Sequence, residues 1–224
     1  MLKLPNVTLI SFDGKSNEES GLQPTIQALI HSCKEIEFGS VKLISYIEPK
    51  NLPSPIKHEY IDKIKDIDQW SHDIIYKFGQ YVNTDFAILV HADGFIVNPD
   101  SWRDEFLEYD YIGAPWPLPN DNFSYRDING EVIRVGNSVS LRSKRLIDLP
   151  VKLNMEWKPF HGFYNEDGFI CVNNRHIYIE NGMKFADIEV AKYFSHETMI
   201  PEIEGIKPFA FHRYFGTNSK YPKF

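Results

Sequence analysis

Strand-like and helix-like segments alternate over the first part of the chain, and this order constrains the fold more than any other feature. Residues 7–12 and 41–47 have strand-like composition, whereas residues 22–32 and 69–82 carry apolar side chains at helical spacing. Residues 85–90 (DFAILV) form a continuous apolar run, of the kind that is buried on both faces of a parallel sheet. Strands that alternate with helices predict a doubly wound α/β arrangement here.

The composition of the sequence changes after Asn98. Loops rich in Pro, Trp and Asp follow, and residues 132–141 have the pattern of a strand. Asn165 is placed to cap a helix that runs to Asn181, with Gly182 as its stop. We therefore expect one α/β domain over the whole chain, with a regular half up to about residue 95 and a mixed half after it.

The chain is acidic. Its 24 Lys and Arg residues stand against 31 Asp and Glu, which gives a formal net charge of −7. With no run of basic residues, this balance argues against binding to nucleic acid or to an anionic membrane. An anionic ligand would need a local device, such as a metal ion, a helix N-terminus or a single arginine. The 42% of hydrophobic residues are enough for a core and exclude a disordered chain.

Cysteine usage and the shortness of the apolar runs bear on location. Cys33 and Cys171 lie far apart, which excludes a disulfide scaffold or a Cys-based zinc site and suits a reducing compartment. The N-terminal apolar stretch is interrupted by Pro5 and Asn6 and resembles a first strand more than a signal peptide. No apolar run approaches the roughly 20 residues of a membrane-spanning helix. We expect a cytoplasmic protein, and the oligomeric state stays open.

Several acidic and imidazole side chains stand where a site is expected. Asp93 and His91 directly follow the apolar strand, and ligands of open α/β sheets bind at the carboxyl ends of strands. Glu166 and Asp167 place two carboxylates at a predicted helix start, and His212 lies in an aromatic cluster near the C-terminus. Each also has a structural interpretation: a turn for Asp93, a complement to the helix dipole for the acidic pair, and packing for the histidines.

Two further segments are candidates for ligand contact. Residues 136–143 (GNSVSLRS) are small enough for the backbone to approach a ligand, although they also fit a turn before a strand. Trp116 lies in a proline-stiffened loop, where an indole either stacks on a sugar or fills a core. The patterns GxxxxGK[ST], GxGxxG, GxSxG and HExxH are absent, so P-loop, Rossmann, serine hydrolase and zinc protease chemistry lack their signals.

Taken in order, these segments resemble glycosyltransferases of the GT-A fold. Residues 91–116 (HADGFIVNPDSWRDEFLEYDYIGAPW), followed by VGNSVSLRS, resemble a bacterial and viral family of predicted glycosyltransferases with the pattern (Q/H)xDGF…YDYIGAPW…GNGGFSLRS. The resemblance spans about residues 85–215, and YDYIGAPW is a fairly specific block. The chain departs from the pattern at Ser138 and Val139, where the family usually has Gly-Gly or Gly-Phe.

The resemblance implies a mixed, mostly parallel sheet flanked by helices, with a nucleotide-binding half at about residues 1–95 and an acceptor-side half at about 96–224. In this fold an acidic motif at a strand end holds Mn²⁺ or Mg²⁺. Asp93 matches the second acid of the motif, and His91 occupies the place of the first. His212 matches, by its order in the chain, a histidine that completes the metal site. Carboxylate and imidazole groups both ligate Mn²⁺.

The resemblance also implies transfer of a sugar from a nucleotide-sugar, a UDP- or GDP-sugar, to a glycan or lipid-linked acceptor, with inversion at the sugar. Asp167, or alternatively Glu166, would take the proton of the acceptor hydroxyl, although a helix N-terminus lowers the pKa of a carboxylate and weakens it as a base. The residues expected at the donor are Asp13, Asp93, Asn137 and Arg142, with Arg213 as a further cation, and those expected at the acceptor are Gly113, Trp116 and Phe163.

Two other functions remain open at this point. A carbohydrate-binding module without catalysis would use Trp116 and the neighbouring aromatics to stack on sugar. A sugar-nucleotide pyrophosphorylase would need a glycine-rich, basic loop after the first strand, where this chain reads FDGKSNEES. That segment is too acidic and lacks the glycines, so the pyrophosphorylase is the weaker alternative.

Overall fold

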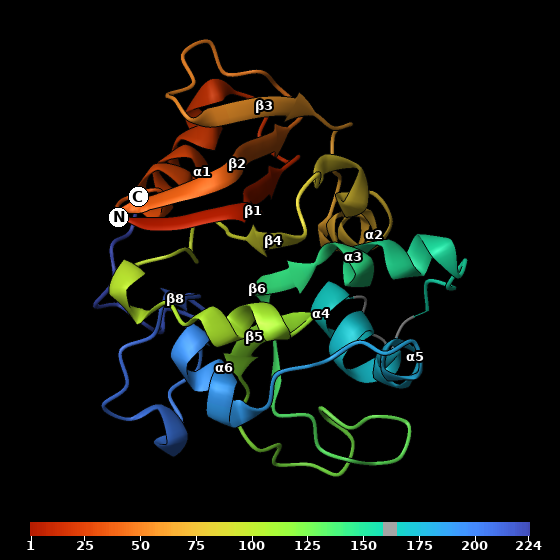
Figure 1. Cartoon of the computed structure of the whole chain (residues 1–224). Coiled ribbons are helices and arrows are strands. Elements are labelled where there is room, and N and C mark those ends of the chain that lie inside the picture. Colours follow the sequence, from red (N-terminus) through yellow and green to blue (C-terminus); the bar gives the residue numbers. More distant parts are fainter. Residues whose placement is uncertain (159–164) are drawn as a thin grey trace.

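A computed structural model describes residues 1–158 and 165–224 (Figure 1). A six-stranded sheet has the order β3-β2-β1-β4-β6-β5. Its first four strands in that order are parallel, and β6 runs antiparallel between β4 and β5. The strands are β1 (Leu2–Asp13), β2 (Ile36–Ser45), β3 (Ile56–Tyr60), β4 (Phe86–Leu89), β5 (Tyr111–Pro115) and β6 (Val135–Ser143).

Helices and one small second sheet complete the chain. The α-helices are α1 (Glu19–Ser32), α2 (Ile67–Tyr76), α3 (Lys144–Lys152), α4 (Glu166–Gly168), α5 (Arg175–Glu180) and α6 (Ile188–Phe194). The short 3₁₀ turns are η1 (Phe78–Tyr81), η2 (Pro99–Ser101), η3 (Asp104–Glu108) and η5 (Pro201–Ile203), and η4 (Phe169–Asn173) is a π-helical turn. Strands β7 (Ser195–His196) and β8 (Ala210–Phe211) pair in parallel.

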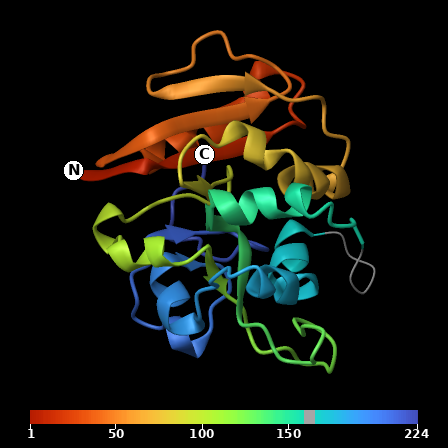
Figure 2. The ribbon, with the colours of Figure 1, turned by 45° about the vertical axis from the view of Figure 1, so that its right-hand side comes forward.

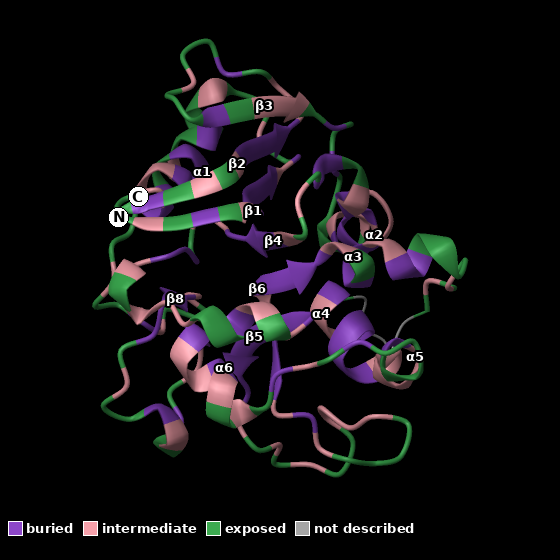
Figure 3. Ribbon diagram, in the orientation of Figure 1, coloured by how far each residue is buried: buried purple, intermediate pink, exposed green. Residues whose placement is uncertain are grey.

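The core lies on both faces of the sheet because side chains alternate along each strand. In β1, Val7 and Leu9 pack in a cluster that includes side chains of α1 and α6, whereas Ile10 and Phe12 pack in a second cluster with side chains of α2 and η1. Figure 3 shows the buried residues gathered in the second halves of β1 and β2 and along β4 and β6. The predicted α/β class and the mostly parallel, helix-flanked sheet are confirmed.

The elements predicted in the first half are present with shifted bounds: β1 and α1 are longer than predicted, and β4 is shorter. The helix predicted at 69–82 divides into α2 and η1, and Asp66 caps α2 by accepting a hydrogen bond from the Gln69 amide at 2.8 Å. Strand β3 follows three prolines, a pattern that predicts a loop, and it pairs with β2 from Val41 onward. In the second half the strand predicted at 132–141 is β6.

Two predictions for the second half are wrong in detail. The helix predicted from Asn165 to Asn181 is three short pieces, α4, η4 and α5, and the Asn165 side chain makes no cap hydrogen bond. Gly182 does end this region, at φ 77°. The segment predicted as a proline-stiffened loop contains β5, which is buried against β6 along its whole length. Tertiary pairing, rather than local composition, makes it a strand.

The sheet topology brings distant segments to one edge. The carboxyl ends of β1 and β4 lie side by side, in the register Ile10↔Leu89. Because β6 runs antiparallel to β4, with Leu89 opposite Ser140, the first residues of β6 lie at the same edge. The loop between β5 and β6 extends on the side of the molecule opposite β3, in both orientations of Figures 1 and 2. Within the described ranges, no helix is long and apolar enough to cross a membrane.

Candidate active site

Two adjoining cavities lie at and beyond this edge of the sheet. The first, here named the strand-end cavity, has a volume of about 350 Å³ and is lined by Asp13, Lys15, Trp70, Asp93 and His212, among others. The second, here named the aromatic cavity, has a volume of about 330 Å³, and its lining includes Trp116, Tyr125, Asp167, Glu197 and Tyr214. The cavities meet where His212 of the first contacts Glu197 of the second.

Asp93 lies at the tip of a tight turn after β4. The turn is closed by two backbone hydrogen bonds between His91 and Gly94, of 2.7 and 3.2 Å. The backbone carbonyl of Asp93 accepts a hydrogen bond from the Arg213 amide at 2.8 Å, and its side chain is 57% exposed. The turn therefore presents a carboxylate to the strand-end cavity while the backbone holds the C-terminal segment in place.

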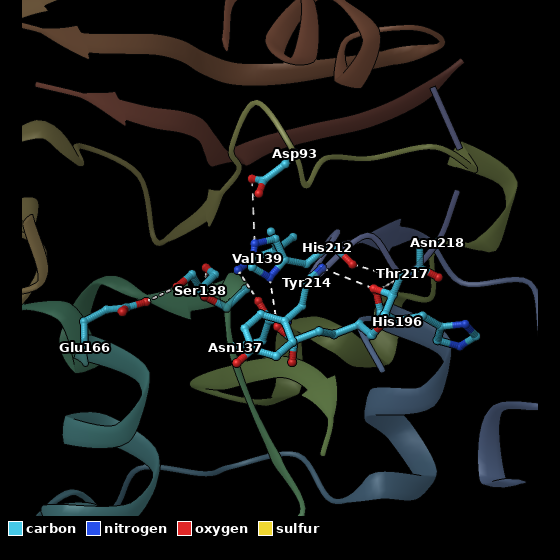
Figure 4. Close-up of polar contacts among 12 residues, drawn as sticks. Asp93, Asn137, Ser138, Val139, Glu166, His196, His212, Tyr214, Thr217 and Asn218 are labelled. Atoms are coloured by element: carbon cyan, nitrogen blue, oxygen red, sulfur yellow. Dashed lines mark hydrogen bonds and ion pairs between the residues drawn. The ribbon is translucent and has the colours of Figure 1, made fainter. Parts of the chain in front are cut away.

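His212 reaches Asp93 because the C-terminal segment crosses directly over Gly94. A Cβ on Gly94 would lie 2.8 Å from Cδ2 of His212 and 2.6 Å from the Val139 side chain, so a larger residue would push them away. The Nε2 atom of His212 lies 3.7 Å from Oδ1 of Asp93 (Figure 4). Its Nδ1 atom bonds Oε1 of Glu197 at 2.9 Å. The structure thus brings together two of the three residues that were predicted as metal ligands, Asp93 and His212.

The contact with Glu197 sets the orientation and charge of the His212 ring. Burial by itself lowers the pKa of His212, but the hydrogen bond to Glu197 and the charges of Glu197 and Asp93 raise it above its ordinary value. Asn218 fixes the backbone on both sides of this contact, because its Nδ2 atom lies 2.9 Å from the Glu197 carbonyl oxygen and 2.8 Å from that of His212 (Figure 4). A carboxylate that holds one ring nitrogen leaves the other free for a ligand.

His91 does not join Asp93 and His212 in a compact metal cluster. In the part of the chain that the structure describes, no group of three His, Cys, Asp or Glu side chains is arranged to hold a metal ion. The His91 ring packs between those of Trp70 and His212, at centroid distances of 5.4 and 5.8 Å. Burial, followed by the charges of His212 and Arg142, lowers the pKa of His91 to about 3, so its ring is neutral.

The donors present nevertheless fit a divalent cation shared with a substrate. Mg²⁺ is normally held by one or two carboxylates together with substrate phosphates and waters, so a complete protein cage is not required. Asp93 and His212 supply an oxygen and a nitrogen donor at one wall of the strand-end cavity. His91 also lines this cavity, and its buried Nε2 atom has no hydrogen-bond partner among the described residues. The side chains at this wall therefore fit a divalent cation that a substrate also binds.

The two adjacent carboxylates of α4 have different environments. Glu166 is buried, and its Oε1 atom accepts a hydrogen bond from Ser138 at 2.6 Å (Figure 4). The same atom accepts a second hydrogen bond from Arg142 at 3.1 Å. Arg142 is also buried, and its Nε atom donates to Ser140 at 2.8 Å. The expectation that Arg142 contacts the donor is wrong, because its side chain lies in the core and neutralises Glu166.

Asp167 faces the aromatic cavity and is free of this ion pair. Burial, and then the charges of Glu166 and Glu197, raise its pKa to about 7, whereas the Gly168 amide and Arg142 lower it less. The sequence position predicts the opposite, a pKa lowered by a helix N-terminus. The structure favours the raised pKa because α4 is only 3 residues long, so that burial and the two neighbouring carboxylates outweigh its dipole. A carboxylate with a pKa near neutrality is suited to accept a proton.

Replacement of Arg142 by methionine should destabilise the protein by about 3–5 kcal/mol, because Glu166 would be left buried without its charged partner. Urea unfolding measures this loss. Lys144→Met is the matched control: Lys144 pairs with Asp148 on the surface, where the loss should stay below about 1 kcal/mol. In the Arg142→Met background, Glu166→Gln should recover part of the stability. If Arg142→Met leaves the unfolding free energy unchanged and weakens nucleotide binding, Arg142 would instead be a contact of the donor.

The other predicted contacts divide between the cavities and the core. Asp13 lines the strand-end cavity, where its carboxylate accepts hydrogen bonds from Ser16 and Thr25. Trp116 borders the aromatic cavity, but its ring is largely buried and stacked on Tyr125 at a centroid distance of 4.8 Å.

Of the three remaining predicted residues, Asn137 and Gly113 line neither cavity. Asn137 is buried at φ 106°, its Oδ1 atom accepts a hydrogen bond from the Val139 amide, and it lines neither cavity. Gly113 also lines neither, because it packs against β6, where a Cβ would lie 1.8 Å from the Gly136 oxygen. Its predicted acceptor contact is wrong, and its role is close strand packing. Phe163 lies outside the described residues.

Sequence reasoning missed three residues that shape the site. Lys15 lines the strand-end cavity, and no other Lys or Arg among the described residues does. Arg213, which was expected as a further cation, instead donates hydrogen bonds to the carbonyls of Tyr221 and Pro222. Glu197 and Asn218 act through His212. Lys15 directly follows the Asp13-Gly14 turn signal at the end of the first strand, a position that could have identified it. No local pattern marks the other two.

Comparisons with known proteins found several solved structures that are similar to this chain. The crystal structure of a glycosyltransferase involved in the glycosylation of the major capsid of PBCV-1 matches over 96% of this chain and 95% of that chain, with a TM-score of 0.52 and 10% identity. GlyE, a glycosyltransferase of Streptococcus pneumoniae TIGR4, matches at a TM-score of 0.44 and 11% identity, over 92% of this chain and 54% of that one. The bifunctional IspDF of Campylobacter jejuni matches at a TM-score of 0.46 and 12% identity, over 81% of this chain and 48% of that chain.

The likeness to the PBCV-1 enzyme shows that this chain has a glycosyltransferase-like fold, and the low identity leaves its activity to be argued from the site. A search of the curated proteins finds no match. Residues 54–212, well over half of the chain, match the family described as "Protein of unknown function (DUF5672)". The segment matched includes the Asp93 turn, β6, α4 and His212. The chain belongs to the DUF5672 family.

Proposed function

We propose that this protein is a metal-dependent glycosyltransferase that moves a sugar from a nucleoside diphosphate sugar to an acceptor hydroxyl, with inversion at the sugar. The observation that carries the proposal is the pairing of Asp93 with His212 in the strand-end cavity, with the proton-accepting carboxylate Asp167 in the adjoining cavity. The fold shared with the PBCV-1 glycosyltransferase supports the same activity.

The strand-end cavity has the groups that a nucleoside diphosphate needs on an acidic protein. Asp93 and His212 would hold a Mn²⁺ or Mg²⁺ ion, which would neutralise the charge that develops on the diphosphate as it leaves. Lys15 adds a cation at the same cavity. The Trp70 ring, fixed by a hydrogen bond from its Nε1 atom to the Phe12 carbonyl at 3.3 Å, offers an aromatic surface beside it.

The aromatic cavity has the groups that an acceptor needs. Asp167 would take the proton of the acceptor hydroxyl as the oxygen attacks the anomeric carbon. Glu166 is unsuited to that role because it is buried and its Oε1 atom already accepts hydrogen bonds from Ser138 and Arg142. Since Asp167 lines one cavity and the proposed diphosphate site is the other, we expect attack from the side opposite the leaving group, which inverts configuration.

The direct test is hydrolysis of nucleotide-sugars, because a glycosyltransferase slowly transfers its donor to water. A panel of UDP-, GDP-, dTDP- and CMP-sugars should contain at least one diphosphate donor that is cleaved in Mn²⁺ and spared in EDTA. The CMP-sugars, which lack the diphosphate, serve as the matched control and should not be cleaved. A protein that binds glycans but hydrolyses no donor would instead be a carbohydrate-binding module.

A further inference from the structure

The charged side chains of the aromatic cavity are all acidic in the described part of the chain. Asp167 and Glu197 line it, whereas no Lys or Arg does so among the residues that the structure describes. Arg134 bonds the carbonyl of Trp116, but its guanidinium is already paired with Glu202 at 2.8 Å. A ligand in this cavity therefore meets carboxyl groups and, among the described residues that line it, no Lys or Arg.

The cavity has hydroxyl and amide groups beside its two carboxylates. Ser124, Thr198 and Asn173 line it with groups that can both donate and accept hydrogen bonds, whereas an ionised carboxylate only accepts them. A ligand that complements both kinds of group must itself offer O–H or N–H donors, as a polyol does. An ionised phosphate or carboxylate has only acceptors to offer.

The walls of the cavity are aromatic. Trp116 and Tyr125 are stacked at an interplanar angle of 28°, and Phe123 and Tyr214 line the same space while each remains about half exposed. Such rings combine a large apolar face with, for tyrosine and tryptophan, a polar edge. This combination suits a sugar ring, whose C–H face is apolar and whose rim carries hydroxyls.

We propose that the acceptor of this enzyme is an uncharged sugar, and that acceptors with a phosphate or carboxylate close to the reacting hydroxyl are rejected. The inference rests on the proposed function, because it assigns the aromatic cavity to the acceptor. It excludes a polyprenyl phosphate whose own phosphate oxygen would attack the donor. A glycan attached to a lipid remains allowed when its terminal sugar is neutral.

The test compares acceptors that differ only in charge, with the donor found in the hydrolysis panel. Methyl glucoside, galactoside and mannoside are each paired with the matching 6-carboxylate, and undecaprenyl phosphate is added as an anionic lipid acceptor. The neutral member of at least one pair should be used with a kcat/KM about 10–100-fold higher than its anionic counterpart, given the repulsion expected a few ångströms from a carboxylate. Equal or better use of the anionic acceptors would overturn the inference.

A charge introduced into the cavity tests the same point from the protein side. Thr198 lines the cavity, so Thr198→Lys should reduce the preference for the neutral acceptor about tenfold. Thr198→Met is the control: methionine is about as long as lysine but uncharged, so the preference should stay unchanged. An unaltered preference in Thr198→Lys would contradict the proposal. So would donor hydrolysis that persists with transfer to none of the neutral acceptors. Absence of donor hydrolysis altogether would instead refute the proposed function.

Discussion

Replacement of Asp93 by alanine should abolish metal-dependent binding of a nucleoside diphosphate and leave the fold intact. The Asp93 carboxylate would be one of two protein ligands to the cation, so the variant would keep only His212 as a protein ligand. Loss of such an electrostatic contact typically lowers kcat by about 10²–10³-fold. Isothermal titration of UDP and GDP in Mn²⁺, together with donor hydrolysis, measures the effect.

The fold should tolerate this change because of how Asp93 is placed. Its side chain is more than half exposed, and the contact that holds the C-terminal segment is made by its backbone carbonyl, which alanine retains. The unfolding free energy should therefore change by no more than about 0.5 kcal/mol. Asp100→Ala, an exposed aspartate a few residues further along, is the control and should bind nucleotide normally. Undiminished Mn²⁺-dependent affinity in Asp93→Ala would remove this residue from the site.

The position of Asp93 could be predicted from sequence because it depends on local pattern alone. A continuous apolar strand followed by His-Ala-Asp-Gly identifies a strand end, and the topology of open α/β sheets then places the turn at the ligand edge. His212 could be placed beside it only through the resemblance in motif order. The contact itself depends on Gly94, whose missing side chain lets the C-terminal segment approach.

The errors in the predicted site arise from side-chain direction and long-range contacts. Arg142 was expected at the donor, but a cation in a strand gives no sign of whether it faces solvent or core until its partner Glu166 is known. Strand β5 escaped detection because its pairing with β6, rather than its own composition, makes it a strand. Glu197 and Asn218 act through hydrogen bonds to residues far along the chain, and no local pattern reports those.

Replacement of Asp167 by asparagine should remove transfer but keep donor binding. Asparagine has nearly the same shape and cannot accept the acceptor proton, so transfer should fall by about 10²–10⁴-fold, the usual contribution of a general base. In the unmodified protein, transfer should rise with pH through about 7 as this carboxyl ionises. Near-normal transfer by the variant would place the base elsewhere. Asp62→Asn, at an exposed position, is the control.

The same substitution should stabilise the protein at alkaline pH. Because the folded state raises the pKa of Asp167 from about 4 to about 7, the unmodified protein loses stability as the pH rises through this window, and asparagine cannot ionise. Each pKa unit corresponds to about 1.4 kcal/mol, so the gain should be larger at pH 8 than at pH 5 by about 2 kcal/mol. Urea unfolding at both pH values measures it. A gain that does not depend on pH would mean that Asp167 is not held in its protonated form by Glu166, Glu197 and burial, and the case for it as a base near neutrality would fail.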